Sequence, residues 1–228
     1  MKIAGLQKFT LLDYPGHISS IIFTQGCNFR CSYCQNSSLI DISKSECFKE
    51  DEVLEFLSSR KNMLTGVCIT GGEPTIQKDL KEFIKKIKEM GYDIKLDTNG
   101  YNPMMLKELI DEKLIDYVAM DIKAPLDDYE DIIKIKINEN NIKKSIKIIK
   151  ESGINHEFRT TIIKKIHTID KIMKICELVG TKDKLYLQNF ELSDDVIDKN
   201  LNSFTKEELI TIQKLIKEVY PNASIRGI

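Results

Sequence analysis

The sequence lacks an apolar stretch long enough to span a membrane, and it lacks an excess of charge of either sign. A membrane-spanning helix needs about 20 mostly apolar residues, and the first residues of the chain contain no apolar core of a signal peptide. The 34 Lys+Arg and 35 Asp+Glu residues nearly cancel, so no global attraction draws the chain to nucleic acid or anionic lipid. We therefore expect a cytoplasmic protein that binds neither nucleic acid nor membranes.

Linkers, internal repeats and low-complexity segments are also missing from the 228 residues. This length suits one domain, and a hydrophobic content of 42% is enough for a core. We predict a single domain over residues 1–228, with an N-terminal extension over about residues 1–17 and a core over about residues 18–220.

Apolar runs rich in β-branched residues alternate with longer amphipathic segments. Strands are predicted over residues 18–24, 67–70, 93–97, 117–122, 156–163 and 185–190. Helices are predicted over residues 48–60, 80–90, 104–110, 142–150, 169–179 and 206–220. Six βα units with short connections predict an α/β fold of parallel strands with helices packed outside, and both a doubly wound sheet and a barrel fit this order.

Polar residues and glycines follow the predicted strands, at the edge where parallel α/β folds place their functional sites. In chain order they are Gly26-Cys27, Gly71-Gly72-Glu73, Asp97-Thr98-Asn99-Gly100, Asp121-Ile122-Lys123, Arg159 and Gln188-Asn189. We expect them to form one composite site.

Half of the six cysteines are crowded into one short segment, as Cys27, Cys31 and Cys34. In a reducing compartment such crowding indicates metal binding rather than disulfides. Thiolates suit iron–sulfur clusters or zinc, and a cubane held by only three cysteines leaves one iron open to a substrate or cofactor. A zinc site completed by His17 is the alternative, although the paired C-x2-C knuckles of many zinc modules are absent.

The remaining cysteines and histidines show no such spacing. Cys47, Cys68 and Cys176 are expected to be small buried side chains, and they give no sign of a second cluster. His156 and His167 have no neighbouring cysteine and are expected to be structural.

The C-x3-C-x2-C loop, with an aromatic residue before its last cysteine, resembles the radical S-adenosylmethionine (radical SAM) superfamily. Gly71-Gly72-Glu73-Pro74 resembles a motif of that superfamily. The segments 12–16 and 23–31, together with Leu96-Asp97-Thr98-Asn99-Gly100, are similar to the activating proteins of anaerobic ribonucleoside-triphosphate reductases. This resemblance covers nearly the whole chain, and it implies a partial (β/α)6 TIM-like barrel.

The resemblance also implies a [4Fe–4S] cluster on Cys27, Cys31 and Cys34, with S-adenosylmethionine chelating the fourth iron. One electron would cleave the sulfonium and release a 5′-deoxyadenosyl radical. That radical would abstract a Cα hydrogen from a glycine of a partner, here an anaerobic (class III) ribonucleoside-triphosphate reductase. Because no second cluster is evident, the electron would come from a flavodoxin or ferredoxin.

Further residues are expected to contact S-adenosylmethionine. The resemblance implies adenine packing for Tyr33, while Gly71 and Gly72 would allow close approach of the backbone to the methionine moiety, with Glu73 near the amino group. The remaining expected contacts, to the ribose, the carboxylate and the end of the sixth strand, are Asp97, Thr98, Asn99, Asp121, Lys123, Arg159 and Gln188.

Two roles remain open among the strand-end charges. Asp97-Thr98 and Met120-Asp121 are expected, by resemblance, to hold a monovalent cation, whereas helix capping or an ion pair would be the structural alternative. Arg159 needs an anion inside its apolar strand. The cofactor carboxylate can meet that need, and Glu73 or Asp121 can do so too.

Two rival functions fit the same motifs. One is a radical SAM enzyme acting on another glycyl-radical enzyme or on a small molecule. The other is a non-enzymatic metal-binding adaptor, which analysis of iron, zinc and acid-labile sulfide would distinguish.

Overall fold

The computed structural model describes residues 1–43 and 48–226. The chain forms two compact units, each assembled from separate segments of sequence. Unit 1 consists of Met1–Asn28, Ser38–Ala119 and Asn141–Asn155, and unit 2 consists of Phe29–Ser37, Met120–Asn140 and His156–Ile228. The cysteine motif contributes to both units, because Cys27 lies in unit 1 and Cys31 and Cys34 lie in unit 2.

Unit 1 contains a sheet whose strands follow one another in chain order. Its strands are β1 (Ile3–Thr10), β2 (Ser19–Thr24), β3 (Gly66–Gly71) and β4 (Asp93–Thr98). β1 is antiparallel to β2, whereas β2, β3 and β4 are parallel. The register places Ile22, Ile69 and Leu96 in one row, and none of these side chains is exposed. Such a row of aliphatic residues is what a fully covered sheet face requires.

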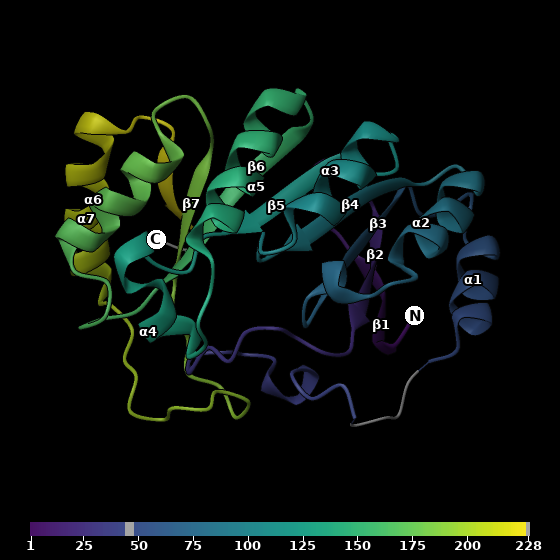
Figure 1. Ribbon diagram of the computed structural model, residues 1–228, viewed down its shortest axis with the longest axis horizontal. Helices are drawn as coiled ribbons and strands as arrows, with labels where there is room; N and C mark the ends of the chain where they lie inside the picture. The colour runs from purple at the N-terminus through teal and green to yellow at the C-terminus, as the bar shows by residue number, and fades with distance from the viewer. Residues whose placement is uncertain (44–47, 227–228) are drawn as a thin grey trace. The chain divides into compact units, whose positions relative to one another are not determined.

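The longer helices of unit 1 bury apolar stripes. They are α1 (Glu50–Ser58), α2 (Leu80–Glu89), α3 (Pro103–Asp111) and most of α5 (Glu139–Ser152), with the short helices η1 (Ser37–Leu39) and η2 (Pro74–Ile76). α2 buries Leu80, Phe83, Ile84 and Ile87 along one side. α1 and α2 lie side by side (Figure 1). These stripes follow the helical spacing of the sequence.

Unit 2 contains three parallel strands in the order β6 (Asn155–Ile162), β7 (Leu185–Asn189) and β8 (Ala223–Arg226). β5 (Tyr117–Asp121) contributes residues to both units. The helices of unit 2 are α4 (Tyr129–Ile133), α6 (Ile169–Val179) and α7 (Lys206–Val219), with η3 (Leu126–Asp128), and α6 and α7 lie side by side (Figure 1). α7 begins at a capping box that Thr205 and Glu208 form.

The structure confirms the α/β class and all six predicted parallel strands to within one or two residues. Among the described residues, the strands β1 and β8, the helix α4 and the short helices η1, η2 and η3 were not predicted. β1 lies within the segment expected to be an N-terminal extension. In the described part of the chain, no helix has both the length and the apolar character needed to cross a membrane.

Candidate active site

The cysteine loop begins at the carboxyl end of β2, where its base is closed by backbone hydrogen bonds within unit 1. The amide of Gly26 donates to the carbonyl of Leu39 at 2.7 Å, and the amide of Cys27 donates to that of Ile40 at 3.2 Å. The side-chain amide of Gln25 also donates to the carbonyls of Ser38 and Asp41, which follow the cysteine motif. Cys27 is therefore held at a fixed point directly after the strand, with its side chain half-buried.

The other two cysteines of the motif lie in unit 2 and share a turn. The amide of Cys34 donates to the carbonyl of Cys31 at 3.1 Å. Burial raises the pKa of the Cys31 thiol to about 11, while the nearby Lys123 acts in the opposite direction. Both thiols, and that of Cys27, are free of disulfides.

This donor set fits an iron–sulfur cluster by its chemistry. Three free thiols at C-x3-C-x2-C spacing are soft ligands that can each bind one iron. Within residues 1–43 and 48–226, no three His, Cys, Asp or Glu side chains form a preformed group for an ion. The assignment of Cys27, Cys31 and Cys34 as ligands therefore rests on their spacing in the sequence and on the chemistry of their thiols.

His17, the alternative zinc ligand, is occupied elsewhere in unit 1. Its ring stacks on Tyr14 with 3.9 Å between centroids, and its Nε2 lies 3.0 Å from the carboxylate of Asp93. His17 precedes β2 whereas Cys27 follows it, so the two residues flank opposite ends of one strand. The geometry of this histidine gives no support to a zinc site with Cys27.

Glu73 joins the carboxyl ends of β3 and β4. Its Oε1 accepts hydrogen bonds from the amide of Thr75 at 3.1 Å, from the Thr75 hydroxyl and from the Thr98 hydroxyl at 2.7 Å. Its Oε2 accepts one from the amide of Asn99 at 2.6 Å. Burial raises the pKa of this carboxyl, and the four hydrogen bonds oppose that shift. The carboxylate that was expected near a cofactor amino group thus also organises the strand ends of unit 1.

A short polar chain connects this carboxylate to the cysteine loop. The Asn99 amide group donates to Oδ1 of Asn28 at 2.8 Å, and that oxygen lies 4.0 Å from the Cys27 sulfur. Since Asn99 is also held by Glu73 through its backbone, three strand-end motifs are joined in one network. Sequence reasoning missed Asn28, because a lone asparagine inside a cysteine motif has no spacing that marks it.

Gly71 and Gly72 are required by the contact between two strand ends. A Cβ on Gly71 would lie 2.2 Å from the backbone nitrogen of Thr24, and its φ of +119° is in a region that favours glycine. A Cβ on Gly72 would lie 2.0 Å from the carbonyl oxygen of Gly26. A contact within the chain therefore requires both glycines, and the close approach expected between their backbone and the methionine moiety stays a prediction.

Asp97 lies next to a buried lysine that the sequence analysis missed. Lys95 is two residues earlier on the same face of β4, and its ammonium pairs with the Asp97 carboxylate. The ammonium also lies 3.8 Å from the sulfur of Cys68. The sequence analysis predicted only a strand over residues 93–97, and side-chain alternation places Asp93, Lys95 and Asp97 on one face of it.

In unit 2, Asp121 lies between two cationic side chains. Nζ of Lys123 is 2.9 Å from its Oδ2, and Nε of Arg159 is 2.9 Å from its Oδ1. Burial acts to raise the pKa of Asp121, but the charges of Arg159 and Lys123 hold that pKa well below its usual range. Of the two protein anions considered for Arg159, Glu73 and Asp121, the structure shows a pair with Asp121, and the contact with the cofactor carboxylate stays a prediction.

The residues expected to hold a monovalent cation do not fit that role. Asp97 is paired with Lys95, and Asp121 is paired with two cationic groups. The Thr98 hydroxyl donates to Glu73, and the side chain of Met120 is not exposed. A cation from solvent would meet fixed positive charge at both carboxylates.

Tyr33 has the orphaned polar atom that a bound cofactor would satisfy. Its side chain is 5% exposed, and its hydroxyl has no hydrogen-bond partner among the described residues. A buried hydroxyl normally has one. Burial raises its pKa well above the usual value, with Lys123 acting against the shift. The orphaned hydroxyl is compatible with the expected contact to S-adenosylmethionine.

The remaining residues of interest in unit 2 are placed as follows. Gln188 is half-buried on β7, in register with Thr161 of β6. His167 accepts a hydrogen bond from the amide of Ile163 at Nδ1, so its Nε2 donates to the carbonyl of Lys123 at 3.1 Å. The imidazole therefore fixes the backbone of a residue that binds Asp121, in line with its expected structural role. Cys68 and Cys176 are buried, and Cys47 lies outside the described residues.

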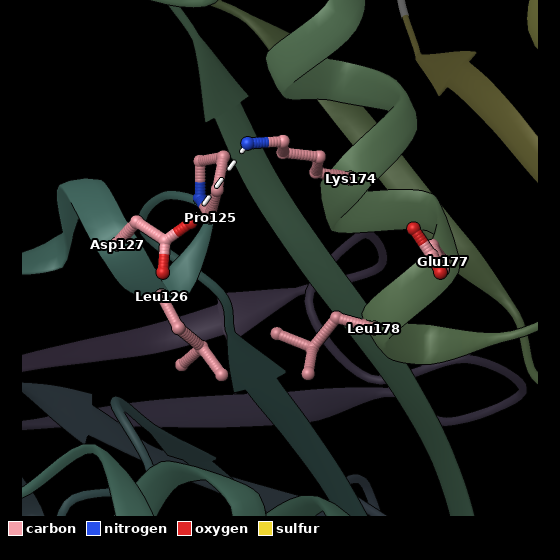
Figure 2. A pocket seen from close by; sticks show the side chains of 6 residues that line it. All are labelled: Pro125, Leu126, Asp127, Lys174, Glu177 and Leu178. Carbon is pink, nitrogen blue, oxygen red and sulfur yellow. Dashed lines mark ion pairs between the residues drawn. The ribbon is translucent and has the colours of Figure 1, made fainter.

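A surface hollow in unit 2 does not belong to this site. It has a volume of about 290 Å³ and lies between η3 and α6 (Figure 2). Leu126 and Leu178 line one end, and Lys174 pairs with Asp127 at 3.8 Å across the other. None of the expected site residues lines this hollow.

Comparison with known proteins identifies the family. The model of the Radical SAM superfamily matches residues 21–179, which include the cysteine motif and the strand ends described above. The chain belongs to the radical SAM superfamily.

Two relatives cover this radical SAM chain almost completely. A Methanocaldococcus jannaschii protein assigned by name to the glycyl-radical enzyme activating enzymes is 34% identical over 99% of this chain and 96% of its own length. The pyruvate formate-lyase-activating enzyme of Clostridium pasteurianum is 27% identical over 96% of this chain and 98% of its own.

Solved structures of other radical SAM proteins share the fold. Streptococcus suis SuiB bound to its precursor peptide superimposes on 91% of this chain with a TM-score of 0.70 at 16% identity. Native anSMEcpe with bound AdoMet superimposes on 89% with a TM-score of 0.62 at 20% identity. This chain spans 48% and 61% of those two chains. The predicted partial TIM-like barrel architecture is thereby confirmed.

Proposed function

We propose that this radical SAM protein is an activating enzyme that generates a glycyl radical on a partner enzyme. The alignments with the Methanocaldococcus and Clostridium proteins support this, because they extend over nearly the full length of both partners. Similarity confined to the cofactor-binding motifs would leave the substrate class open, whereas end-to-end similarity includes the rest of the chain.

The proposed partner is an anaerobic ribonucleoside-triphosphate reductase, with a flavodoxin or ferredoxin as electron donor in the cytoplasm. The segment 12–16 supports this choice by its resemblance to activators of that reductase. Its Tyr14 is 2% exposed, and a Cβ on Gly66 would lie 2.7 Å from the tyrosine ring. Tyr14 therefore anchors the segment to unit 1 near the amino-terminal end of β2, while the other residues of the segment are exposed.

The proposed roles of the residues follow from the site. Cys27, Cys31 and Cys34 would hold a [4Fe–4S] cluster. One-electron cleavage of S-adenosylmethionine and hydrogen abstraction from a glycine Cα are the chemistry that cluster and cofactor supply when bound. The residues proposed to contact S-adenosylmethionine are Tyr33, Gly71, Gly72, Glu73, Asp97, Asn99, Asp121, Lys123, Arg159 and Gln188.

The chain's own residues contribute orientation and exclusion of water. Glu73 and Asn99 hold Asn28 beside Cys27, so the first ligand is placed relative to the strand ends of unit 1. In unit 2, Arg159 and Lys123 keep Asp121 ionised, and Tyr33, whose side chain is buried two residues after Cys31, would help to exclude water there. The observation that carries the proposal is the three-cysteine motif, whose first member contacts Asn28 and through it the strand-end network of unit 1.

The test uses the full chain, reconstituted anaerobically with iron and sulfide, reduced, and mixed with S-adenosylmethionine and the anaerobic reductase of the same organism. Electron paramagnetic resonance should detect a glycyl-radical doublet, and the same tube should contain 5′-deoxyadenosine. We expect Cys31→Ala to abolish both signals. Cys176→Ala is the matched control, because this cysteine is buried on α6 away from the motif, and it should retain both.

Each outcome of this experiment has a separate meaning. Deoxyadenosine without the doublet would reject the reductase as the partner while keeping radical SAM chemistry. One bound zinc with no acid-labile sulfide would reject the enzyme in favour of an adaptor. Full activity of Cys31→Ala would reject the ligand assignment.

A further inference from the structure

A buried lysine lies beneath the carboxylate of Asp97, on the same face of β4. Only 2% of the Lys95 side chain is exposed, against 13% for Asp97. Two residues advance a strand by about 6.7 Å, a distance that the four-carbon stem of a lysine can bridge. The ammonium pairs with Oδ1 of Asp97, so it lies on the side of the carboxylate that faces the protein interior.

The surroundings of Lys95 make this pairing obligatory. Its Cα lies in register with Cys68, which is in register with Ile21, and both of these neighbours are buried. Its ammonium lies 3.8 Å from the Cys68 sulfur, which is a weak acceptor. Burying an ammonium among such groups is costly unless an anion compensates it. Asp97 is that anion.

We infer that Lys95 permanently supplies the positive charge that a monovalent cation from solvent was expected to supply at Asp97. The inference rests on the proposed function, because Asp97 is proposed to contact S-adenosylmethionine. A second cation on this carboxylate would be repelled by the ammonium at short range, where little water screens the charges. Asp121 in unit 2 has the same arrangement, with Lys123 and Arg159 as its fixed cations.

If Lys95 supplies this charge, binding of S-adenosylmethionine to the wild-type protein should not depend on which monovalent cation is present. Binding of labelled S-adenosylmethionine to the reconstituted full chain is measured by equilibrium dialysis in NaCl, KCl or choline chloride at one ionic strength. Choline is too large to enter a site built for Na⁺ or K⁺. We expect the three dissociation constants to agree within twofold.

Removing the lysine charge should create the cation dependence that the wild-type protein lacks. Lys95→Met keeps the length of the stem and removes the ammonium that pairs with Asp97, so binding in choline should weaken at least tenfold, and Na⁺ or K⁺ should recover most of the loss. The thermal midpoint of the same variant, measured without cluster or cofactor, should be higher in NaCl or KCl than in choline chloride. Lys107→Met is the matched control, because Lys107 pairs with Asp111 on the exposed surface of α3.

Several results would overturn the inference. One is a wild-type protein whose affinity for S-adenosylmethionine rises fivefold with Na⁺ or K⁺, or whose thermal midpoint rises by several degrees. Another is a Lys95→Met protein that behaves like the wild type in all three salts. If Lys95→Met does not fold, the double variant Lys95→Met/Asp97→Asn removes both charges and should show no cation response. A response in the double variant would place the cation elsewhere. Absence of cofactor binding in every salt would instead reject the proposed function, while the midpoints still test Lys95.

Discussion

The carboxylate of Glu73 accepts four hydrogen bonds from three residues although only 1% of the residue is exposed. Two of the donors belong to the end of β4, so this single side chain fixes the spacing of two strand ends. At a buried position surrounded by this many hydrogen-bond donors, a side chain that carries its own N–H donor would leave that donor without an acceptor. The requirement exists in the protein before any cofactor binds.

Glu73→Gln tests that requirement. The variant keeps the shape of the side chain but turns one acceptor into a donor that faces donors, so we expect the free energy of unfolding to fall by about 3 kcal/mol. Urea denaturation of the protein without cluster measures this change. Glu112→Gln, which alters a surface pair with Lys81, should cause a much smaller change. Equal effects of the two substitutions would contradict the structural role of Glu73.

Residues with a characteristic spacing could be predicted from the sequence, and residues defined by burial could not. The cysteines and the residues that follow the strands are marked by position alone. Lys95 has the polarity of a solvent-facing strand position, and only the packing of the sheet shows that its face is covered. Asn28 and Lys95 therefore emerged only from the structure.

Strand ends are the elements on which this site depends. The end of β3 contacts the end of β2 through two backbone hydrogen bonds, in which the amide of Gly72 donates to the carbonyl of Thr24 at 2.9 Å and the amide of Glu73 donates to the carbonyl of Gly26 at 2.9 Å. Both bonds require the two backbones to approach more closely than a side chain allows. Because Gly26 precedes Cys27, this contact also places the first cysteine.

Gly72→Ala should therefore disrupt the loop that begins at Cys27. We expect a loss of roughly 3 kcal/mol or more in the free energy of unfolding, together with reduced iron incorporation on reconstitution. Gly91→Ala is the control, because a Cβ there meets nothing within 4 Å and only its φ of +89° is unfavourable; it should cost about 1 kcal/mol and leave the iron content unchanged. Denaturation and iron analysis of both variants measure the difference. If Gly72→Ala cost no more than Gly91→Ala, the contact between the strand ends would not be essential.

The elements that escaped prediction are short or lie at an edge. β8 has only four residues, which is too few for alternation to be evident, and it follows directly on a proline turn. β1 is exposed at residues 7–9, in its second half, and its sequence lacks the apolar run of a buried strand. The parallel strands between them are covered by helices, and their continuous apolar runs made them predictable.

At the scale of the whole molecule, the chain passes between its two units after residues 28, 37, 119, 140 and 155. Neither unit is a continuous piece of sequence, and β5 contributes residues to both. If one unit unfolded alone, the segments of the other would be connected by long flexible loops, whose closure costs entropy. This connectivity favours the single domain that the sequence predicts.

We therefore expect one cooperative unfolding transition for the cluster-free protein. Calorimetry should give a ratio of calorimetric to van't Hoff enthalpy near one, with a total enthalpy of about 160 kcal/mol for a chain of this length. The protein contains no tryptophan, so Tyr101→Trp in unit 1 and Tyr220→Trp in unit 2 provide one local probe each. For each variant, the midpoint of the fluorescence transition should coincide with the midpoint measured by calorimetry. Two resolved heat-absorption peaks, or probes that report separate midpoints, would show that the two units unfold independently. Cys27 in unit 1 could then lose its folded environment while Cys31 and Cys34 in unit 2 keep theirs.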